Sequence, residues 1–337
     1  MGPRKQNGRP PGGVRAAAGR WGRARGAAGA ATAMFCVGTL TAVSPALHHY
    51  PVYGGQALRY ALGGLVLLAV MRARGLPHLR LTGREMGLIT LLAVVGLAVF
   101  NVLVIESTRH ADPATVGTVV ATVPVVLALA GPLMERRRPT PHLVAAAAIV
   151  AGGAGVATGL GGGTPLGVVL ALGVLACEVG FSLLAVPLLA RLGAVRVSAY
   201  ATIAAVPLLL VAGVVVDGRA ALRVPTAGEA TALVYLAVVV TAFAFFCWYD
   251  ALPRLGAERA GLFSGFLPVG AIVGTVVLGT GRPNGAEIAG AALVVAGLVF
   301  GLRPRRRRPE AAPPPEPGGD GVVLSGRPCA GQEGAPR

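Results

Sequence analysis

The sequence is poor in charged, aromatic and cysteine residues, and each shortage argues against a class of protein. Only 13% of its 337 residues are charged and 5% are aromatic, whereas 54% are hydrophobic. Soluble domains carry about a quarter charged residues, so a soluble enzyme is not expected, and a disordered chain would be less apolar. The four cysteines have neither the spacing of a disulfide framework nor that of a metal site. The composition therefore indicates a chain surrounded mainly by lipid.

Acidic residues are especially scarce, with 14 acids against 30 bases and a net charge of +16. On a folded surface such an excess would suggest a nucleic-acid partner. Here the bases cluster at the two termini and between apolar runs, which is the pattern that orients a membrane protein, so we expect no nucleic-acid partner. Lys5 is the single lysine, and with the abundant Ala and Gly this favours a GC-rich, bacterial coding sequence.

Ten apolar runs approach the length of about 20 residues that a helix needs to cross a bilayer. The first follows an Arg-rich stretch but is too long for the apolar region of a signal peptide, so we interpret it as a retained helix. The sequence thus predicts an all-α integral membrane protein with ten transmembrane helices, at residues 28–47, 53–71, 86–105, 114–134, 142–160, 166–188, 198–216, 229–249, 259–279 and 285–302.

The distribution of bases predicts the orientation of these helices. With a cytoplasmic N-terminus, 25 of the 30 bases lie in cytoplasmic segments and 4 in outer segments. This is a strong positive-inside bias. We therefore expect a multi-pass protein of the bacterial cytoplasmic membrane with both termini in the cytoplasm. Residues 1–27 and 303–337, rich in Gly, Pro and Arg, are predicted to be disordered tails.

The two halves of the chain match weakly but in order. Ser44-Pro45 aligns with Val186-Pro187 at an offset of 142, and Val123-Pro124 aligns with Leu267-Pro268 at an offset of 144. Five helices per repeat is an odd number, so the second copy is inverted relative to the first, as in many secondary transporters. The predicted repeats are residues 28–160 and 166–302.

Two blocks of short motifs stand in the order of a known family. One runs from His110-Ala111-Asp112-Pro113 to Ala151-Gly152-Gly153, and the other from Trp248-Tyr249-Asp250 to Leu278-Gly279. With Arg59-Tyr60 in the second helix, they resemble the EamA-type members of the drug/metabolite transporter superfamily. The resemblance implies a secondary transporter, without a cofactor, that exports a small, amino-acid-like metabolite by alternating access.

Glu178 is the deepest acid, about twelve residues or roughly 18 Å into its helix. A charge at that depth costs several kcal/mol, so such residues are informative. The EamA family more often has an aromatic residue at this position. The string Ala176-Cys177-Glu178-Val179 resembles the first helix of the small multidrug resistance proteins, in which a membrane glutamate binds protons and cationic drugs. We predict a proton or cation site at Glu178; a protonated glutamate bonded to a neighbouring helix is the structural alternative.

Arg59 and Asn101 are predicted at similar depth below the outer surface, in the second and third helices. Arg59 has three candidate roles: it binds a substrate carboxylate, it reaches outward to the surface, or it pairs with Glu106. Weaker candidates for a cavity wall, which are alternatively interfacial anchors, are Gln56, Tyr60 and Trp248.

Pro124 and Pro268 occupy corresponding places in the fourth and ninth helices, where paired breaks would point to a central site. Glycine pairs four residues apart, at 261/265, 270/274 and 297/301, predict close helix packing or, at 297/301, dimerisation. The sequence contains no motif in the context that a phosphate-binding loop, a pair of zinc ligands or a catalytic triad would require.

The sequence therefore predicts a transporter with lipid and a small molecule as partners, acting as monomer or homodimer. Alternatives are a proton-coupled exporter of cationic drugs, a structural membrane protein and a lipid-modifying enzyme.

Overall fold

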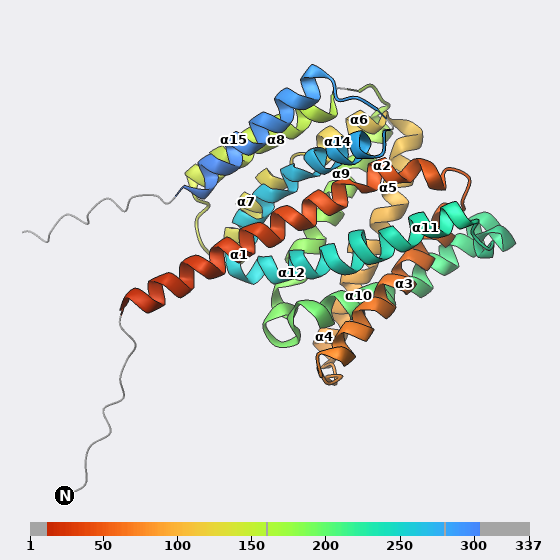
Figure 1. Ribbon diagram of the computed structural model, residues 1–337, viewed down its shortest axis with the longest axis horizontal. Coiled ribbons are helices and arrows are strands. Elements are labelled where there is room, and N and C mark those ends of the chain that lie inside the picture. Colours follow the sequence, from red (N-terminus) through yellow and green to blue (C-terminus); the bar gives the residue numbers. More distant parts are fainter. Residues whose placement is uncertain (1–11, 160, 280, 304–337) are drawn as a thin grey trace, which may run out of the picture. The chain divides into compact units, whose positions relative to one another are not determined.

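The computed structural model describes residues 12–159, 161–279 and 281–303. Within this part of the chain, ten helical segments are long and apolar enough to cross a membrane, so the predicted all-α fold with ten transmembrane helices is confirmed (Figure 1). The segments are Trp21–Leu47, Val52–Ala73, Gly83–His110, Pro113–Met134, Pro141–Thr158, Pro165–Leu183, Val186–Leu222, Ala227–Leu255, Ala257–Val277 and Gly285–Leu302.

Several segments contain more than one helical element, because short 3-10 or π-helical stretches interrupt them. The first half consists of α1 (Gly12–Gly38), α2 (Leu40–Val43), η1 (Ser44–Leu47), α3 (Val52–Ala73), α4 (Gly83–Ala93), η2 (Val94–Val99), α5 (Phe100–His110), α6 (Pro113–Val120), α7 (Val123–Met134) and α8 (Pro141–Thr158). The second half consists of α9 (Pro165–Leu183), α10 (Val186–Asp217), η3 (Gly218–Leu222), α11 (Ala227–Tyr235), η4 (Leu236–Phe243), α12 (Ala244–Leu255), α13 (Ala257–Gly261), η5 (Leu262–Phe266), α14 (Leu267–Val277) and α15 (Gly285–Leu302).

The N-terminal region corrects one sequence expectation. Residues 12–27 belong to α1 instead of forming a disordered tail. The expectation was based on polarity and ignored helix propensity. This stretch is rich in Ala and Arg, which are both good helix formers. The apolar helix that follows has already formed the first helical turn, the unfavourable step of helix formation, so α1 can extend into the stretch. Residues 1–11 and 304–337, which hold the rest of the two predicted tails, lie outside the described residues.

The sixth and seventh predicted helices also have different boundaries. α9 ends at Leu183, five residues earlier than expected, and α10 begins at Val186. Gly193 has a φ of 72° inside α10 and turns the chain there. A left-handed backbone at this turn is unstrained only for glycine, since any other side chain would clash with its own carbonyl.

Irregularities of the helices recur at corresponding places in the two halves. The π-helical elements η2 and η4 begin 142 residues apart, at Val94 and Leu236. Capping boxes start α4 and α11, in which Thr82 and Thr226 are bonded to the glutamate three residues further on. The prolines Pro124 and Pro268 stand at the start of α7 and α14, directly after a break in each segment. Both halves therefore break and restart their helices at matching positions.

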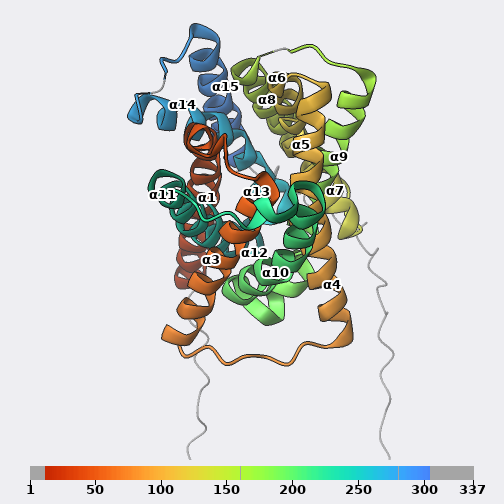
Figure 2. The same ribbon diagram turned by 90° about the vertical axis from the view of Figure 1, so that its right-hand side faces the viewer.

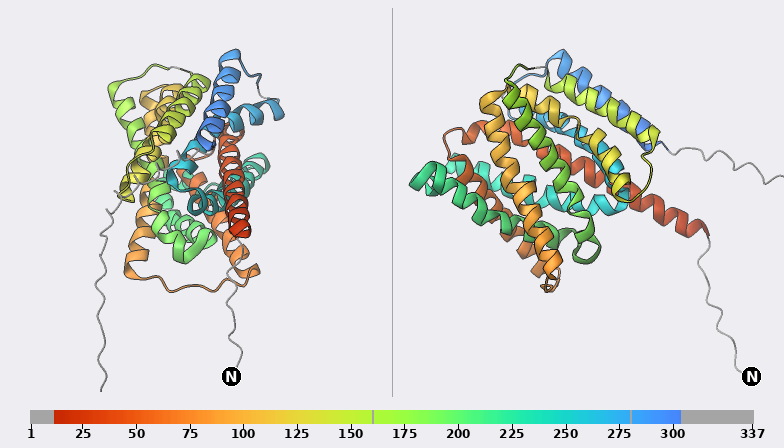
Figure 3. Two further views of the ribbon diagram at one scale, coloured as in Figure 1. Left: turned by 90° about the vertical axis from the view of Figure 1, so that its left-hand side faces the viewer. Right: turned by 180° about the vertical axis from the view of Figure 1, so that it is seen from behind.

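Small residues bring the helices close together. α8 packs along α15, α3 along α10, α1 along α12 and α5 along α9. Figure 2 shows α5 beside α9, and the rear view in Figure 3 shows α8 beside α15. A Cβ atom on Gly153 of α8 would lie 2.8 Å from the carbonyl oxygen of Gly290 in α15. Lipid tails are as apolar as the helix surfaces, so the hydrophobic effect does not hold helices together inside a membrane. Van der Waals contact between closely spaced backbones stabilises the pair instead.

The glycine pairs predicted from spacing face other helices of the same chain. A Cβ on Gly261 would lie 2.8 Å from the Cβ of Leu127, and one on Gly301 would lie 2.8 Å from the Cβ of Ala146. Gly270 meets the backbone of Phe35, and Gly297 meets Val150. These glycines pack the bundle, and the 297/301 face of α15 is covered by α8 and η5 rather than left open for a second copy.

Candidate substrate cavity

A cavity of about 280 Å³ lies where α3 meets the end of the first segment and the start of the eighth. Most of its wall is apolar, and a single charged side chain, Arg59, lines it together with the amide of Gln56. The lining comes from α2, η1, the loop before α3, α3 itself, α11 and η4: Leu40, Ser44, Leu47, His48, Tyr50, Pro51, Val52, Gly55, Gln56, Arg59, Leu233 and Leu236.

Arg59 is buried, with 5% of its surface exposed, and neutral oxygens hold it in place. Its Nε donates to Oγ1 of Thr241 at 2.7 Å, and its Nη1 donates to Oε1 of Gln56 at 3.3 Å. The expected alternative of a bridge to Glu106 is wrong, because Glu106 instead pairs with Arg109 at 3.0 Å. Reaching outward is also wrong, since the guanidinium is buried. Among the described residues, Arg59 has no carboxylate partner.

Local structure explains how Arg59 reaches Thr241. Thr241 lies in the π-helical element η4, and Gly63, one turn after Arg59, faces the same element. A Cβ on Gly63 would lie 3.0 Å from both the Ala237 carbonyl oxygen and the Thr241 Cγ2. Glycine therefore lets α3 approach η4 closely enough for the bond between Arg59 and Thr241 to form. π-Helical turns of this kind are frequent at functional sites.

Tyr60 and Asn101 form a second polar pair beside the cavity. Nδ2 of Asn101 donates to the Tyr60 hydroxyl at 3.1 Å and to the carbonyl oxygen of Leu97, in η2, at 2.6 Å. Both side chains are buried. The Arg59 guanidinium carbon lies 5.4 Å from the centre of the Tyr60 ring. The pair thus stands directly behind the arginine, although neither residue lines the cavity.

Glu178 lies on α9, half-buried and outside the cavity lining. Within the described part of the chain its carboxyl forms no hydrogen bond, so the structural alternative of a bond to a neighbouring helix is not realised here. Tyr249 of α12 lies within electrostatic range of both Glu178 and Tyr60. The Tyr249 hydroxyl donates to the Phe181 carbonyl oxygen at 3.3 Å, one turn along α9 from Glu178. Tyr249 is therefore near both the acid and Tyr60 of the polar pair.

The other predicted site residues lie away from the cavity wall. Trp248 is 2% exposed and packs in the core, so it is not an interfacial anchor, and its Nε1 has no hydrogen-bond partner among the described residues. Pro124 and Pro268 lie at the helix restarts described above, and neither lines the cavity. The structure thus brings Gln56 and Arg59 together, with Tyr60 and Asn101 behind them.

The sequence did not single out Thr241, Tyr50 or the residues that join Tyr50 to α11 through hydrogen bonds, which are Arg223, Thr226 and Glu229. The pattern Thr-Xaa-Xaa-Glu occurs at residues 82–85 and again, 144 residues later, at 226–229, and this capping motif could have identified Thr226 and Glu229. Tyr50 is buried, and burial raises the pKa of its phenol, which therefore stays protonated and can donate a hydrogen bond. In the described residues, no group of three His, Cys, Asp or Glu side chains is arranged to hold a metal ion.

Ten apolar helical segments, three of which line a cavity with one buried guanidinium, define a multi-pass membrane protein. The sequence model of the EamA-like transporter family matches residues 24–159 and again residues 165–303. The chain therefore belongs to the EamA-like transporter family, as its motifs indicated, and it is a membrane transporter.

Two relatives agree with this assignment. The chain is 23% identical over 296 residues to the uncharacterized transporter YetK of Bacillus subtilis (strain 168), covering 85% of this chain and 89% of that protein. A solved crystal structure with 25% sequence identity has a TM-score of 0.73 and covers 83% of this chain and 98% of the other.

Proposed function

We propose that the protein is a secondary transporter that exports a small organic metabolite with a carboxylate group, such as an apolar amino acid, by alternating access. The observation that carries this proposal is the buried Arg59 in an otherwise apolar cavity. Its guanidinium is held by two neutral groups, and no carboxylate lines the cavity to neutralise it. A buried cation without a counter-ion is costly, and a substrate carboxylate would supply one. Support for export comes from the family resemblance.

The cavity size limits the substrate. At about 280 Å³ it is at the lower end of ligand pockets, so it suits a metabolite of amino-acid size and not a large drug. The Gln56 amide can bond a second polar group, while Leu40, Leu233 and Leu236 can contact an apolar side chain.

Matching breaks in the two halves support an inverted repeat as the mechanism of alternating access. The π-helical elements, capping boxes and prolines recur 142 to 144 residues apart, and one family model matches each half. Two similar halves of opposite orientation can rock against each other around a site between them.

Transport in proteoliposomes tests the carboxylate requirement. Purified protein is reconstituted, and the flux of labelled leucine is compared with that of leucinamide, in which the carboxylate is blocked. We expect at least tenfold faster flux for the free acid, because a charge-assisted bond contributes about 1.5–3 kcal/mol. Equal flux of the two compounds would contradict the proposed role of Arg59, and flux of neither compound, nor of a wider metabolite panel, would contradict the substrate class.

Labelling of single cysteines tests the proposed cytoplasmic termini and location in the cytoplasmic membrane. In a cysteine-free background, cysteines replacing His78 or Arg138 should not react with an impermeant thiol reagent in intact cells. Cysteines replacing Gly163 or Ala220 should react. Labelling at position 138 from outside would overturn both the orientation and the inverted repeat.

A proton-coupled exporter of cationic drugs is the second candidate, and Glu178 favours it. A carboxyl without a hydrogen bond inside a membrane helix can take up and release a proton. Proton coupling is compatible with either substrate class. The carboxylate proposal is favoured for the cavity, because its lining holds a cation and no acid. A structural protein or a lipid-modifying enzyme has no comparable support in the described residues.

A further inference from the structure

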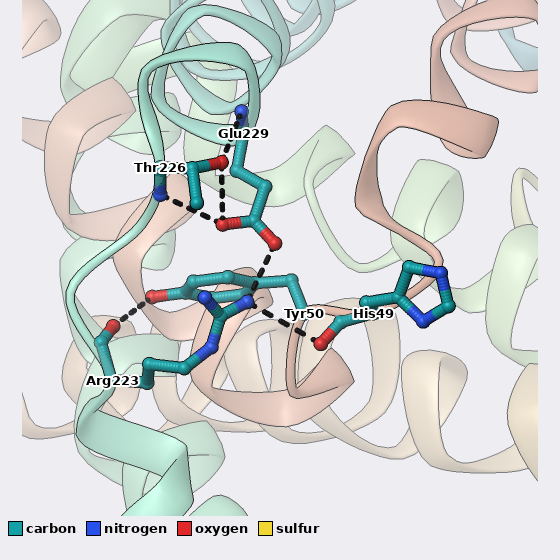
Figure 4. A network of polar contacts seen from close by, with 5 residues as sticks. All are labelled: His49, Tyr50, Arg223, Thr226 and Glu229. Carbon is teal, nitrogen blue, oxygen red and sulfur yellow. Dashed lines mark hydrogen bonds and ion pairs between the residues drawn. The ribbon is translucent and has the colours of Figure 1, made fainter.

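Five residues beside the cavity form one polar network, which we name the Arg223 clasp: His49, Tyr50, Arg223, Thr226 and Glu229 (Figure 4). Nη2 of Arg223 donates to Oε1 of Glu229 at 2.5 Å and to the His49 carbonyl oxygen at 3.3 Å. The Tyr50 hydroxyl donates to the Arg223 carbonyl oxygen at 2.7 Å, and the Arg223 guanidinium carbon lies 4.8 Å from the centre of the Tyr50 ring. The clasp thereby joins the loop before α3 to the segment before α11.

Glu229 is held on both of its carboxylate oxygens. While Oε1 accepts from Arg223, Oε2 accepts from the backbone nitrogen of Thr226 at 2.8 Å and from its hydroxyl at 2.9 Å. Glu229 is 7% exposed and the Arg223 side chain 38% exposed, so these charge-assisted bonds are partly shielded from water. The same carboxylate therefore starts α11 and closes the clasp.

The two segments that the clasp joins also form the wall of the cavity. His48, Tyr50 and Pro51 come from the loop before α3, and Leu233 and Leu236 come from α11 and the start of η4. Separation of these segments would widen the cavity at the end of α3 that begins at Val52. The bonds of the clasp therefore hold the two segments of that wall together.

A second, matching network lies at the start of α4, after the loop that follows α3, and we name it the Arg191 clasp. Arg191 pairs with Glu85 and donates from Nη2 to the Arg80 carbonyl oxygen at 3.1 Å. Glu85 also accepts from the Thr82 backbone nitrogen at 2.8 Å, as the capping residue of α4. Each clasp thus bonds an arginine to a capping glutamate and to a backbone carbonyl of the loop at one end of α3, Arg80 lying near the start of α4, but no residue of the Arg191 clasp lines the cavity.

We propose that Arg223, Glu229 and Tyr50 form a gate of the substrate cavity, and that breaking their bonds widens the path by which substrate passes at the Val52 end of α3. The Arg191 clasp has the same role at the opposite end. This inference rests on the proposed function, because it takes the cavity to be part of the transport path. Alternating access then requires that the two clasps are not open together.

The test measures access to the cavity directly. Ser44, which lines the cavity, is replaced by cysteine in a cysteine-free background, and its rate of reaction with an impermeant thiol reagent is measured in right-side-out and inside-out vesicles. Glu229→Gln keeps the capping box, which accepts Gln as well as Glu, but removes the charge that binds Arg223. We expect labelling about tenfold faster than in the parent from the side that the Val52 end of α3 faces, which is the outer side in the proposed orientation. Tyr50→Phe, which removes only one hydroxyl, should raise the rate about threefold.

Glu85→Gln is the matched control, because it makes the same chemical change in the other clasp. It should not accelerate labelling of Ser44→Cys from the same side. Equal rates for the parent and Glu229→Gln, in protein that inserts normally, would overturn the gate, and so would an equal increase with Glu85→Gln. If Glu229→Gln does not insert, Tyr50→Phe decides the question. Labelling needs no substrate, so a failure of the carboxylate proposal would be seen in the flux assay and not here.

Discussion

Arg59 and Glu178 are both ionisable residues inside membrane helices, but their surroundings differ. Arg59 is bonded to Thr241 and Gln56 and lines a cavity, with the pair of Tyr60 and Asn101 behind it. Glu178 has no hydrogen bond among the described residues, and the neutral phenol of Tyr249 lies within electrostatic range of it. A guanidinium keeps its charge under all physiological conditions, so it must be held by fixed partners. A carboxyl can become neutral and needs none.

From this difference we propose different tasks for the two regions. The fixed, oriented guanidinium is suited to recognition of an anionic group, since its position does not change with the state of the substrate. The free carboxyl is suited to a change of protonation during the transport cycle. Substitutions that alter one region and leave the other intact separate these tasks.

The largest effect is expected at Arg59. Arg59→Gln removes the cation but keeps a polar side chain, and transport of a carboxylate substrate should fall about 100-fold because a charge-assisted, bidentate contact is lost. Arg59→Lys keeps the charge but not the planar fork, and should lose about tenfold. Initial rates in proteoliposomes over a range of substrate concentrations measure both changes.

The matched control is Arg109→Gln, since Arg109 is exposed and paired with Glu106 at 3.0 Å. Its transport rate should remain within twofold of the parent, because exposed pairs contribute little. Equal losses at positions 59 and 109 would mean that the Arg59 effect is not specific to the cavity.

Glu178→Gln should have the next largest effect, and on a different quantity. The variant cannot titrate, so accumulation driven by a proton gradient should be lost, whereas exchange of substrate without a gradient should continue at about the parent rate. Glu178→Asp should shift the pH dependence and keep partial coupling. The ratio of gradient-driven uptake to exchange distinguishes these outcomes. Uphill transport by Glu178→Gln at the parent rate would show that Glu178 only packs its helix.

Thr241→Val should have a smaller effect. It keeps the shape of the side chain but removes the oxygen that accepts from Arg59 Nε. We expect the KM for a carboxylate substrate to rise about threefold to tenfold with little change in the maximal rate, because one hydrogen bond contributes about 0.5–1.5 kcal/mol. A fall in the maximal rate with an unchanged KM would mean that Thr241 acts in the conformational step and not in positioning Arg59.

Deletion of residues 309–337 should have the smallest effect. This segment has few apolar groups, so its loss should leave membrane insertion and transport within twofold of the parent. Abundance in the membrane and initial flux measure the two quantities. A large loss of flux at normal abundance would indicate a regulatory tail.

Much of the fold was predictable, because crossing a bilayer imposes a length and a hydropathy on each helix. All ten segments were found, but the N-terminal start of α1 was placed too late and α9 was expected to end later than Leu183. Both errors concern helix ends, which depend on propensity and capping rather than on hydropathy. The π-helical stretches were not predicted, since their sequences are as apolar as their neighbours.

The cavity was predictable only in part. Arg59 and Gln56 stood out because polar groups are expensive inside an apolar run. The partner of Arg59 was not predictable: Thr241 lies 182 residues away and hydroxyls are common in membrane helices. The sequence offered Glu106 as a partner, which the structure places with Arg109. The roles of Glu178, Pro124 and Pro268 in transport stay predictions.

The sequence by itself determined the class of this protein, its ten membrane crossings and the few ionisable residues, such as Arg59 and Glu178, that lie inside apolar helices. These follow from hydropathy and charge, which are summed along the chain and need no knowledge of neighbours. Only the tertiary structure decided which helices line the cavity, why Arg59 meets Thr241 and which residues form the two clasps. Such contacts depend on how closely backbones approach, as at Gly63, and shape of that kind is a property of two packed surfaces and not of either segment alone.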